Sequence, residues 1–101
     1  MANEAHASGN WLVKEGREAE FVARWTEFLE WTRETVPGLV SASLIQDEGN
    51  AGHFVSIALW DRPESRAAWK SHDDFPGKLG ACRELCEEFT GGDYELAVHV
   101  S

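Results

Sequence analysis

Hydrophobic positions recur along the chain with two different periods, and these periods divide it into helices and strands. Between Arg17 and Val36 the apolar residues follow the spacing of one helix face, which predicts an amphipathic helix that the next Pro-Gly pair ends. Residues 39–46 and 53–60 alternate with a period of two, which is typical of strands. A turn over residues 48–52 separates them, so we expect an antiparallel hairpin.

The N-terminal part of the chain carries a weaker pattern. Residues 1–9 are small and polar and predict a flexible N-terminus ahead of a single domain over residues 10–101. A short strand is predicted over residues 10–14. Farther along, Asp61 followed three residues later by Glu64 is a capping-box pattern, so we expect a short helix over residues 62–71.

A third helix and a last strand are predicted for the C-terminal part. Helical spacing relates the apolar residues Leu79, Cys82, Leu85, Cys86 and Phe89, and the Gly91-Gly92 pair would stop this helix. The acidic run over residues 84–88 would then be mostly a solvated helix face. Residues 94–100 alternate as the last strand.

This order of elements predicts an α+β fold of the ferredoxin-like kind. Four strands form an antiparallel sheet, and helices between the first and second strands and between the third and fourth cover one face. The other face would carry apolar residues that nothing else in the chain covers. Because an uncovered apolar face usually marks an association surface, we expect a symmetric homodimer with sheet packed against sheet.

Composition and charge narrow the classes of partner. The 101 residues are enough for one domain, and 43% of them are hydrophobic, which is enough for a core. A net charge of -9 disfavours nucleic acid and anionic membrane surfaces as partners. No apolar run approaches the roughly 20 residues of a membrane helix. The N-terminus lacks the features of a secretion signal, so a cytoplasmic location is expected.

Cys82 and Cys86 are the two cysteines of the chain. Four residues apart on the predicted helix, they would share one face in a geometry poorly suited to a mutual disulfide. No His or further Cys lies nearby to complete a metal site, so no metal is expected. We interpret both as buried thiols that pack as small apolar groups.

Aromatic residues gather around one predicted corner of the sheet. Trp60 ends a strand, Trp69 lies on the following helix, and Phe75 comes soon after, so we expect these three side chains to lie near one another. Together with Trp11 on the first strand they are the candidate walls of an apolar substrate pocket. The alternative for each of the four is plain core packing, in which no cavity is left. For Trp11 a contact with the second copy of a dimer is a further alternative.

Histidine is the residue type that most readily exchanges a proton near neutral pH. His72 stands between Trp69 and Phe75, so it is the candidate catalytic residue and is expected near the mouth of the pocket. His53 and His99 lie on predicted strands and have less sequence context. The alternative for each is a surface or hydrogen-bonded histidine without a chemical role.

The stretch from Phe54 to Trp60, the helix that holds Trp69-Lys70-Ser71 and the following Phe75 resemble the antibiotic biosynthesis monooxygenase-like domain. The strand that begins after Gly38 and the long first helix also fit. The resemblance covers nearly the whole chain from about residue 10. It implies a dimeric α+β barrel, the superfamily to which such domains belong.

Known members of this family imply several activities. Some oxidise polyphenols or anthrones to quinones without a cofactor, some oxidise quinols, some degrade haem, and many have no known reaction. Two functions therefore stand for this chain: a cofactor-independent monooxygenase that oxidises a polycyclic phenol, anthrone or quinol with O₂, and a non-catalytic homodimer that binds a small aromatic molecule. The first needs only a pocket that holds and desolvates the ring and accepts a proton.

Haem degradation is a third, less expected activity. The resemblance to the haem-degrading branch rests on an Asn on the first strand, a Trp on the middle helix and a His ten residues after that Trp. Trp69 matches the Trp, and the Asn position falls near Gly9 or Asn10, but Leu79 stands where the His would be. The usual haem ligand is therefore missing, and His72 is the alternative ligand, displaced along the chain.

Overall fold

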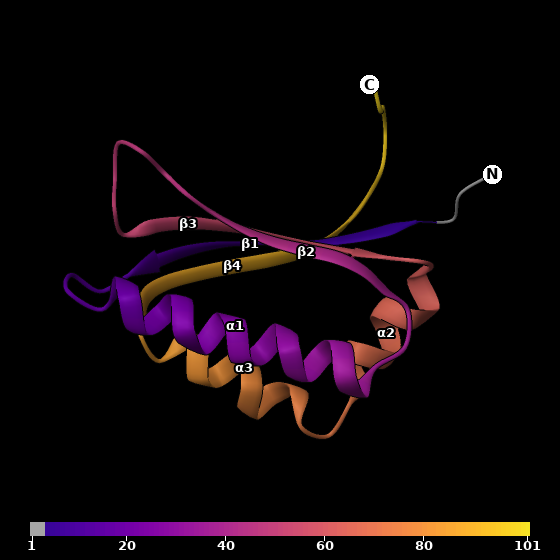
Figure 1. The fold of residues 1–101 in the computed structure, drawn as a ribbon, viewed down its shortest axis with the longest axis horizontal. Helices are drawn as coiled ribbons and strands as arrows, with labels where there is room; N and C mark the ends of the chain where they lie inside the picture. The colour runs from indigo at the N-terminus through magenta and orange to yellow at the C-terminus, as the bar shows by residue number, and fades with distance from the viewer. Residues whose placement is uncertain (1–3) are drawn as a thin grey trace.

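The computed structural model describes residues 4–101, which fold as a four-stranded antiparallel sheet with helices on one face (Figure 1). In chain order the elements of this part are β1 (Ala5–Val13), α1 (Glu18–Thr35), β2 (Leu39–Gln46), β3 (His53–Trp60), α2 (Pro63–Ser71), α3 (Phe75–Arg83) and β4 (Cys86–Glu95). The strand order is β2-β3-β1-β4, and each neighbouring pair is antiparallel. The predicted ferredoxin-like α+β fold is confirmed.

Strong periodicity predicted the middle of the chain well. Strands β2 and β3 have the predicted bounds, and α1 begins and ends one residue inside its predicted range. The turn between α1 and β2 needs its glycine, because Gly38 has φ of +105°. A Cβ at Gly38 would also lie 2.5 Å from the hydroxyl oxygen of Ser65 on α2.

The first strand begins earlier than its sequence pattern predicted. Strand β1 starts at Ala5, not at residue 10, and it pairs with both β3 and β4 from Ala5 onward. The prediction of a flexible segment is therefore wrong for residues 5–9, and residues 1–3 lie outside the described part. Small residues such as Ala5, Ala7 and Gly9 give little hydrophobic signal, yet they are buried on an inner strand of the sheet.

The predicted third helix extends too far along the chain, because its C-terminal part belongs to strand β4. Helix α3 ends at Arg83, and Cys86 and Phe89 lie in β4, so the acidic run is not a helix face. The Gly91-Gly92 pair does not stop a helix; it pairs with Gly9 and Ser8 of β1. Strand β4 ends at Glu95, whereas the last strand was predicted to reach residue 100, and residues 96–101 have no regular secondary structure.

Residues 86–89 form a strand and not a helix because of a cross-strand contact, which local residue spacing cannot predict. Phe89 pairs in register with Trp11, and their ring centroids lie 4.0 Å apart.

The capping-box prediction for α2 is also wrong. Arg62 is the N-cap residue, without a side-chain cap hydrogen bond, and the Asp61 carboxylate lies 3.8 Å from the Arg62 side chain instead.

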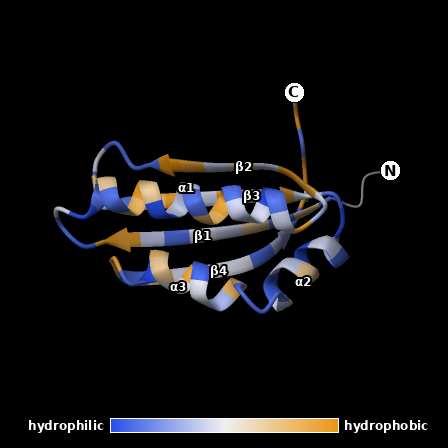
Figure 2. Cartoon of the chain, turned by 60° about the horizontal axis from the view of Figure 1, so that its bottom comes forward, coloured by the Kyte–Doolittle hydropathy of each residue, from blue (hydrophilic) through white to orange (hydrophobic). Residues whose placement is uncertain are grey.

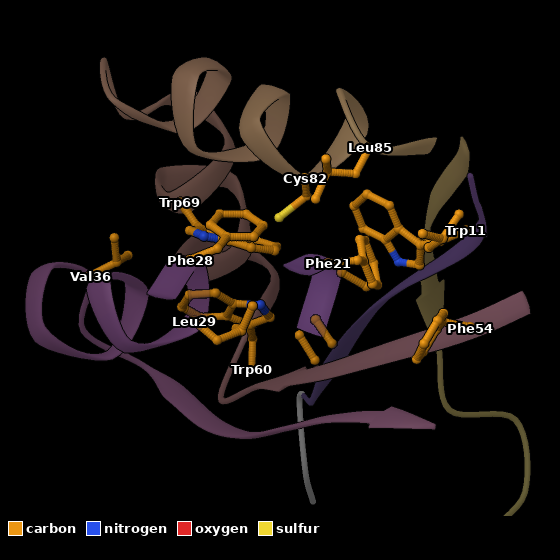
Figure 3. Packing of buried hydrophobic residues seen from close by; sticks show 14 residues of the cluster. Trp11, Phe21, Phe28, Leu29, Val36, Phe54, Trp60, Trp69, Cys82 and Leu85 are labelled. Atoms are coloured by element: carbon orange, nitrogen blue, oxygen red, sulfur yellow. The ribbon is translucent and has the colours of Figure 1, made fainter. Parts of the chain in front are cut away.

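The buried core lies between the sheet and the helices and contains two groups of aromatic side chains (Figure 3). One group, at one end of β1 and β3, joins Phe28, Trp60 and Trp69. The other joins Trp11, Phe21 and Phe54 at the opposite end. Between them the facing positions of the strands carry small residues.

The sheet face opposite the helices has no cover in the described chain (Figure 1). Ile45, Ile57 and Tyr94 are 56%, 41% and 57% exposed. The C-terminal segment rises on this side and exposes Val98 and Val100 almost fully. Among the described helices, none has the length and apolar character needed to cross a membrane.

Cys82 is fully buried on α3, and burial, helped by the neighbouring Cys86, raises the pKa of its thiol from 9.0 to about 12. The pKa of the thiol is higher in the folded state than in the unfolded state. Its titration therefore leaves the free energy of unfolding unchanged below about pH 9 and lowers it as the pH rises toward 12. Urea unfolding between pH 8 and 10.5 should show this fall, up to about 1.4 kcal/mol per pH unit from this thiol. Cys82→Ala should have a shallower slope, and equal slopes in the two proteins would contradict the assignment.

Candidate functional site

A cavity of about 190 Å³ opens between the helices and strands β1, β3 and β4. Its floor is the set of small residues between the two aromatic groups: Ala7, Gly9, Ser56, Ala58 and Gly91. These residues are cross-strand neighbours, since Ala7 pairs with Ala58 and Gly9 pairs with both Ser56 and Gly91. Figure 2 shows strongly hydrophobic residues near the end of β1 and paler or hydrophilic ones along its middle. The space exists because no large side chain rises from this part of the sheet.

The walls of the cavity are apolar and mostly aromatic. They are formed by Trp11, Trp25, Phe28, Leu29, Trp69, Phe75, Leu79 and Phe89. Leu79, at the position where the haem-degrading branch has its His, is therefore part of the wall. Within residues 4–101 no group of three or more His, Cys, Asp or Glu side chains is arranged to hold a metal ion.

Two floor glycines allow Phe89 to lie flat against the sheet. A Cβ at Gly91 would come within 2.7 Å of the Phe89 ring. A Cβ at Gly9 would come within 2.9 Å of both Phe89 and the Trp11 indole nitrogen. Without these glycines the Phe89 ring would have to leave its present position. The glycines therefore determine the position of one end wall as well as the depth of the floor.

Trp69 is held in place by a buried hydrogen bond and by three aromatic neighbours. Its Nε1–H donates to Thr32 Oγ1 at 2.9 Å, and that hydroxyl donates to the Phe28 carbonyl oxygen at 2.8 Å. The Trp69 ring centroid lies 5.1 Å from Trp60, 5.0 Å from Phe75 and 5.6 Å from Phe28. Trp69 is thus both a core residue and a wall of the cavity.

The predicted proximity of Trp60, Trp69 and Phe75 is confirmed, but only Trp69 and Phe75 line the cavity. Trp60 is fully buried behind Trp69, and among the described residues its Nε1–H has no hydrogen-bond partner. Trp11 lines the cavity from the other end and donates its indole N–H to Ser56 Oγ at 3.0 Å.

The structure places His72 away from the cavity lining. Its Nδ1 accepts the backbone N–H of Asp74 at 3.0 Å, and its ring meets the edge of Trp31 at 5.1 Å between centroids. It is not among the residues that line the cavity. His99 lies in the exposed C-terminal segment.

His53 lies on the opposite face of the sheet, in a chain of hydrogen bonds with its neighbours. Its Nδ1 is 3.0 Å from Asp47 Oδ2, and its Nε2 is 3.0 Å from Asn10 Oδ1. The hydrogen bond from His53 lowers the pKa of Asp47 below its usual value. Neither His53 nor Asn10 reaches the cavity, because both project from the uncovered face.

Among residues 4–101, Lys70 is the one ionisable side chain that lines the cavity. Its Nζ lies 2.6 Å from Asp93 Oδ1. Sequence reasoning missed this residue together with Trp25, Phe28, Phe89 and the whole floor. The helical stripe of α1 marked Trp25 and Phe28 as core, whereas the floor had no signal, because small residues in a strand look like weak strand formers.

The chain was compared with protein-family models, curated sequences and solved structures. A family model described as antibiotic biosynthesis monooxygenase matches residues 6–88. No curated protein sequence matches the chain.

Several solved structures share the fold at low identity. A variant of SnoaB, described as a cofactor-independent oxygenase from Streptomyces nogalater, is 20% identical, covers 98% of each chain and has a TM-score of 0.89. A conserved protein of unknown function from Bacteroides thetaiotaomicron is 16% identical over 95% of this chain and 100% of its own, with a TM-score of 0.80. A conserved protein from Methanosarcina mazei Go1 is 17% identical, covers 92% of each chain and also has a TM-score of 0.80.

The bond between Trp69 and Thr32 should contribute measurably to stability. Thr32→Val leaves the buried indole N–H without its acceptor, and we expect the free energy of unfolding to fall by about 1–3 kcal/mol. Thr26→Val is the matched control, because Thr26 makes the same bond to a carbonyl four residues earlier but is exposed on the same helix. It should change stability by less than about 0.5 kcal/mol in urea unfolding. Equal losses in the two variants would show that the Trp69 bond adds nothing.

Proposed function

The chain belongs to the antibiotic biosynthesis monooxygenase family, and from this we propose that it is a cofactor-independent monooxygenase that oxidises a polycyclic phenol, anthrone or quinol with O₂. The observation that carries the proposal is the apolar cavity with its floor of small residues and its aromatic walls. Its volume of about 190 Å³ is below the roughly 300–1,000 Å³ of pockets for drug-sized ligands. It suits a compact, flat ring system.

The proposed oxidation needs few catalytic groups from the protein. For an anthrone, a ring CH₂ becomes a carbonyl group; one atom of O₂ enters the product and the other leaves as water. The substrate supplies all four electrons that O₂ accepts, so no external reductant is needed. Once deprotonated, an electron-rich ring can pass an electron to O₂ directly, and the protein must hold and desolvate that ring.

The lining residues suit this task. Trp11 and Phe89 stand at one end of the cavity and Trp69 and Phe75 at the other, so a planar ring meets aromatic surfaces at both ends. Trp11 and Trp69 have their indole N–H groups bonded to Ser56 and Thr32, which fixes the orientation of both walls. Apolar walls exclude water from the reacting ring.

A second candidate is a non-catalytic dimer that binds a small aromatic molecule. One observation favours it: among the described residues that line the cavity there is no His, Asp or Glu to take a proton from the substrate. The two candidates share the ligand and differ in whether O₂ is consumed.

In both cases we propose that the protein works as a homodimer, with the uncovered sheet faces packed together. Ile57 and Ile45 on this face are 41% and 56% exposed. Leu96, Val98 and Val100 of the C-terminal segment extend the apolar surface on the same side. A second copy is the simplest cover for a continuous apolar face.

Oxygen uptake with a panel of anthrones and hydroquinones tests the catalytic proposal. The wild-type protein should consume O₂ with at least one of them, and the product should carry one new oxygen atom. Ala58→Leu should lower kcat/KM by about tenfold or more, since the added atoms occupy the cavity and 1.4 kcal/mol corresponds to tenfold. Ala68→Leu adds the same atoms at an exposed site on α2 and should leave kcat/KM unchanged. Binding without O₂ uptake would favour the non-catalytic dimer.

Sedimentation at micromolar concentration tests the dimer. The wild-type protein should sediment at twice the chain mass, and Ile57→Lys should sediment as a monomer, because it places a charge in the proposed interface. Val22→Lys is the control, since Val22 on α1 is 42% exposed and Ile57 is 41% exposed. A wild-type protein of single-chain mass would refute the dimer.

A further inference from the structure

Lys70 occupies an unusual position for a charged residue in this chain. It lies in the last turn of α2, and it lines a cavity whose other described lining residues carry no charge. Its side chain is 36% exposed, so most of its length is covered while its ammonium group reaches Asp93. The formal charge of the whole chain is -9, so an anion approaching most of the surface would be repelled.

The ammonium group is not fully neutralised by its partner. The Asp93 carboxylate is shared, because Arg66 Nε lies 3.5 Å from the oxygen that Lys70 contacts at 2.6 Å. Arg66 also donates to the backbone oxygens of His6 and Tyr94, at 2.8 and 3.1 Å, which holds it in place. Two cations and one carboxylate leave a local charge of +1 beside the cavity.

Register places this charge close to the floor. Asp93 follows Gly91 by two residues in β4, so both lie on the helix-covered face of the sheet, about 6.5 Å apart along the strand. Gly91 is part of the floor. An ammonium group carries three donors, and the bond to Asp93 uses one of them. Within residues 4–101 the other two donors have no partner, so they can meet an oxygen at the edge of a ring that lies on the floor.

We propose that Lys70 binds an ionised oxygen of the ligand, so that the preferred substrate is a planar aromatic anion, a phenolate or an aromatic carboxylate, and not a neutral hydrocarbon ring. This rests on the proposed function, because it assumes that the cavity holds the aromatic substrate. A cation beside a phenol also favours its ionised form, which is the form that transfers an electron to O₂. Lys70 thus determines specificity and prepares the substrate for oxidation.

Two probes that share one ring system distinguish the contribution of the ligand's charge to binding from the contribution of its ring. At pH 7 2-naphthoate is an anion and 2-naphthol is neutral, and quenching of the tryptophan fluorescence reports binding of either. Lys70→Gln should weaken 2-naphthoate binding by about tenfold or more, as expected for the loss of a hydrogen bond to a charged group, and should leave 2-naphthol binding within about twofold. Lys70→Arg keeps the charge and should retain most of the preference for the anion.

Lys78→Gln is the matched control, because Lys78 is exposed on α3 and lies over Trp31 outside the cavity. It should change neither affinity, and thermal melts should show all three variants folded. If Lys70→Gln leaves the ratio of the two affinities unchanged while 2-naphthol still binds, the role of Lys70 is refuted and the proposed function stands. If neither probe binds the wild-type protein, the aromatic cavity is not a binding site and both proposals fall.

Discussion

The pairing register of the two inner strands, β1 and β3, is the constraint on which the rest of the molecule depends. It places Trp60 and Ala5 at one end of the helix-covered face and Trp11 and Phe54 at the other, with small residues between them. A shift by one residue would move every one of these side chains to the opposite face. The large aromatic side chains would then project from the uncovered face and no longer form the core, and the cavity would lose its floor of small residues.

Within this frame the helices complete the cavity by contacts with the two aromatic groups. Helix α1 contributes Phe28 and the Thr32 hydroxyl that accepts the Trp69 indole N–H, so α1 and α2 are joined over the sheet by one buried bond. A well-packed interior normally leaves few voids larger than a water molecule. A cavity of about 190 Å³ in so small a domain is therefore a cost in stability, and the proposed binding of a ligand would offset that cost.

Charge and apolar surface are distributed unequally over the molecule. The helix-covered side carries the local excess of positive charge formed by Arg66, Lys70 and Asp93, in a chain that is otherwise strongly acidic. The opposite side carries exposed aliphatic residues and the C-terminal segment. The first feature suits an anionic small molecule and the second suits another protein surface, so the two proposed binding functions lie on opposite faces of the sheet.

The sequence by itself determined the middle of the fold and three of the eight wall residues of the cavity. Helix α1 and strands β2 and β3 have long, regular patterns of large apolar residues, and burial of such residues is what periodicity reports. Trp69, Phe75 and Trp11 were found for the same reason, since large aromatic side chains are conspicuous in any reading of the chain. The family resemblance rests on these same segments.

Only the tertiary structure decided the ends of β1 and β4, the floor of the cavity and the placement of the charges. Small residues such as Gly9 and Gly91 are buried by what packs above them and carry no periodic signal of their own. Phe89 fits a helical spacing locally, but its pairing with Trp11 across the sheet makes it a strand residue. Lys70 meets Asp93 across 23 residues of sequence, and Trp60 is hidden behind Trp69. These relations arise from strand pairing and helix packing between distant segments, and no local pattern contains them.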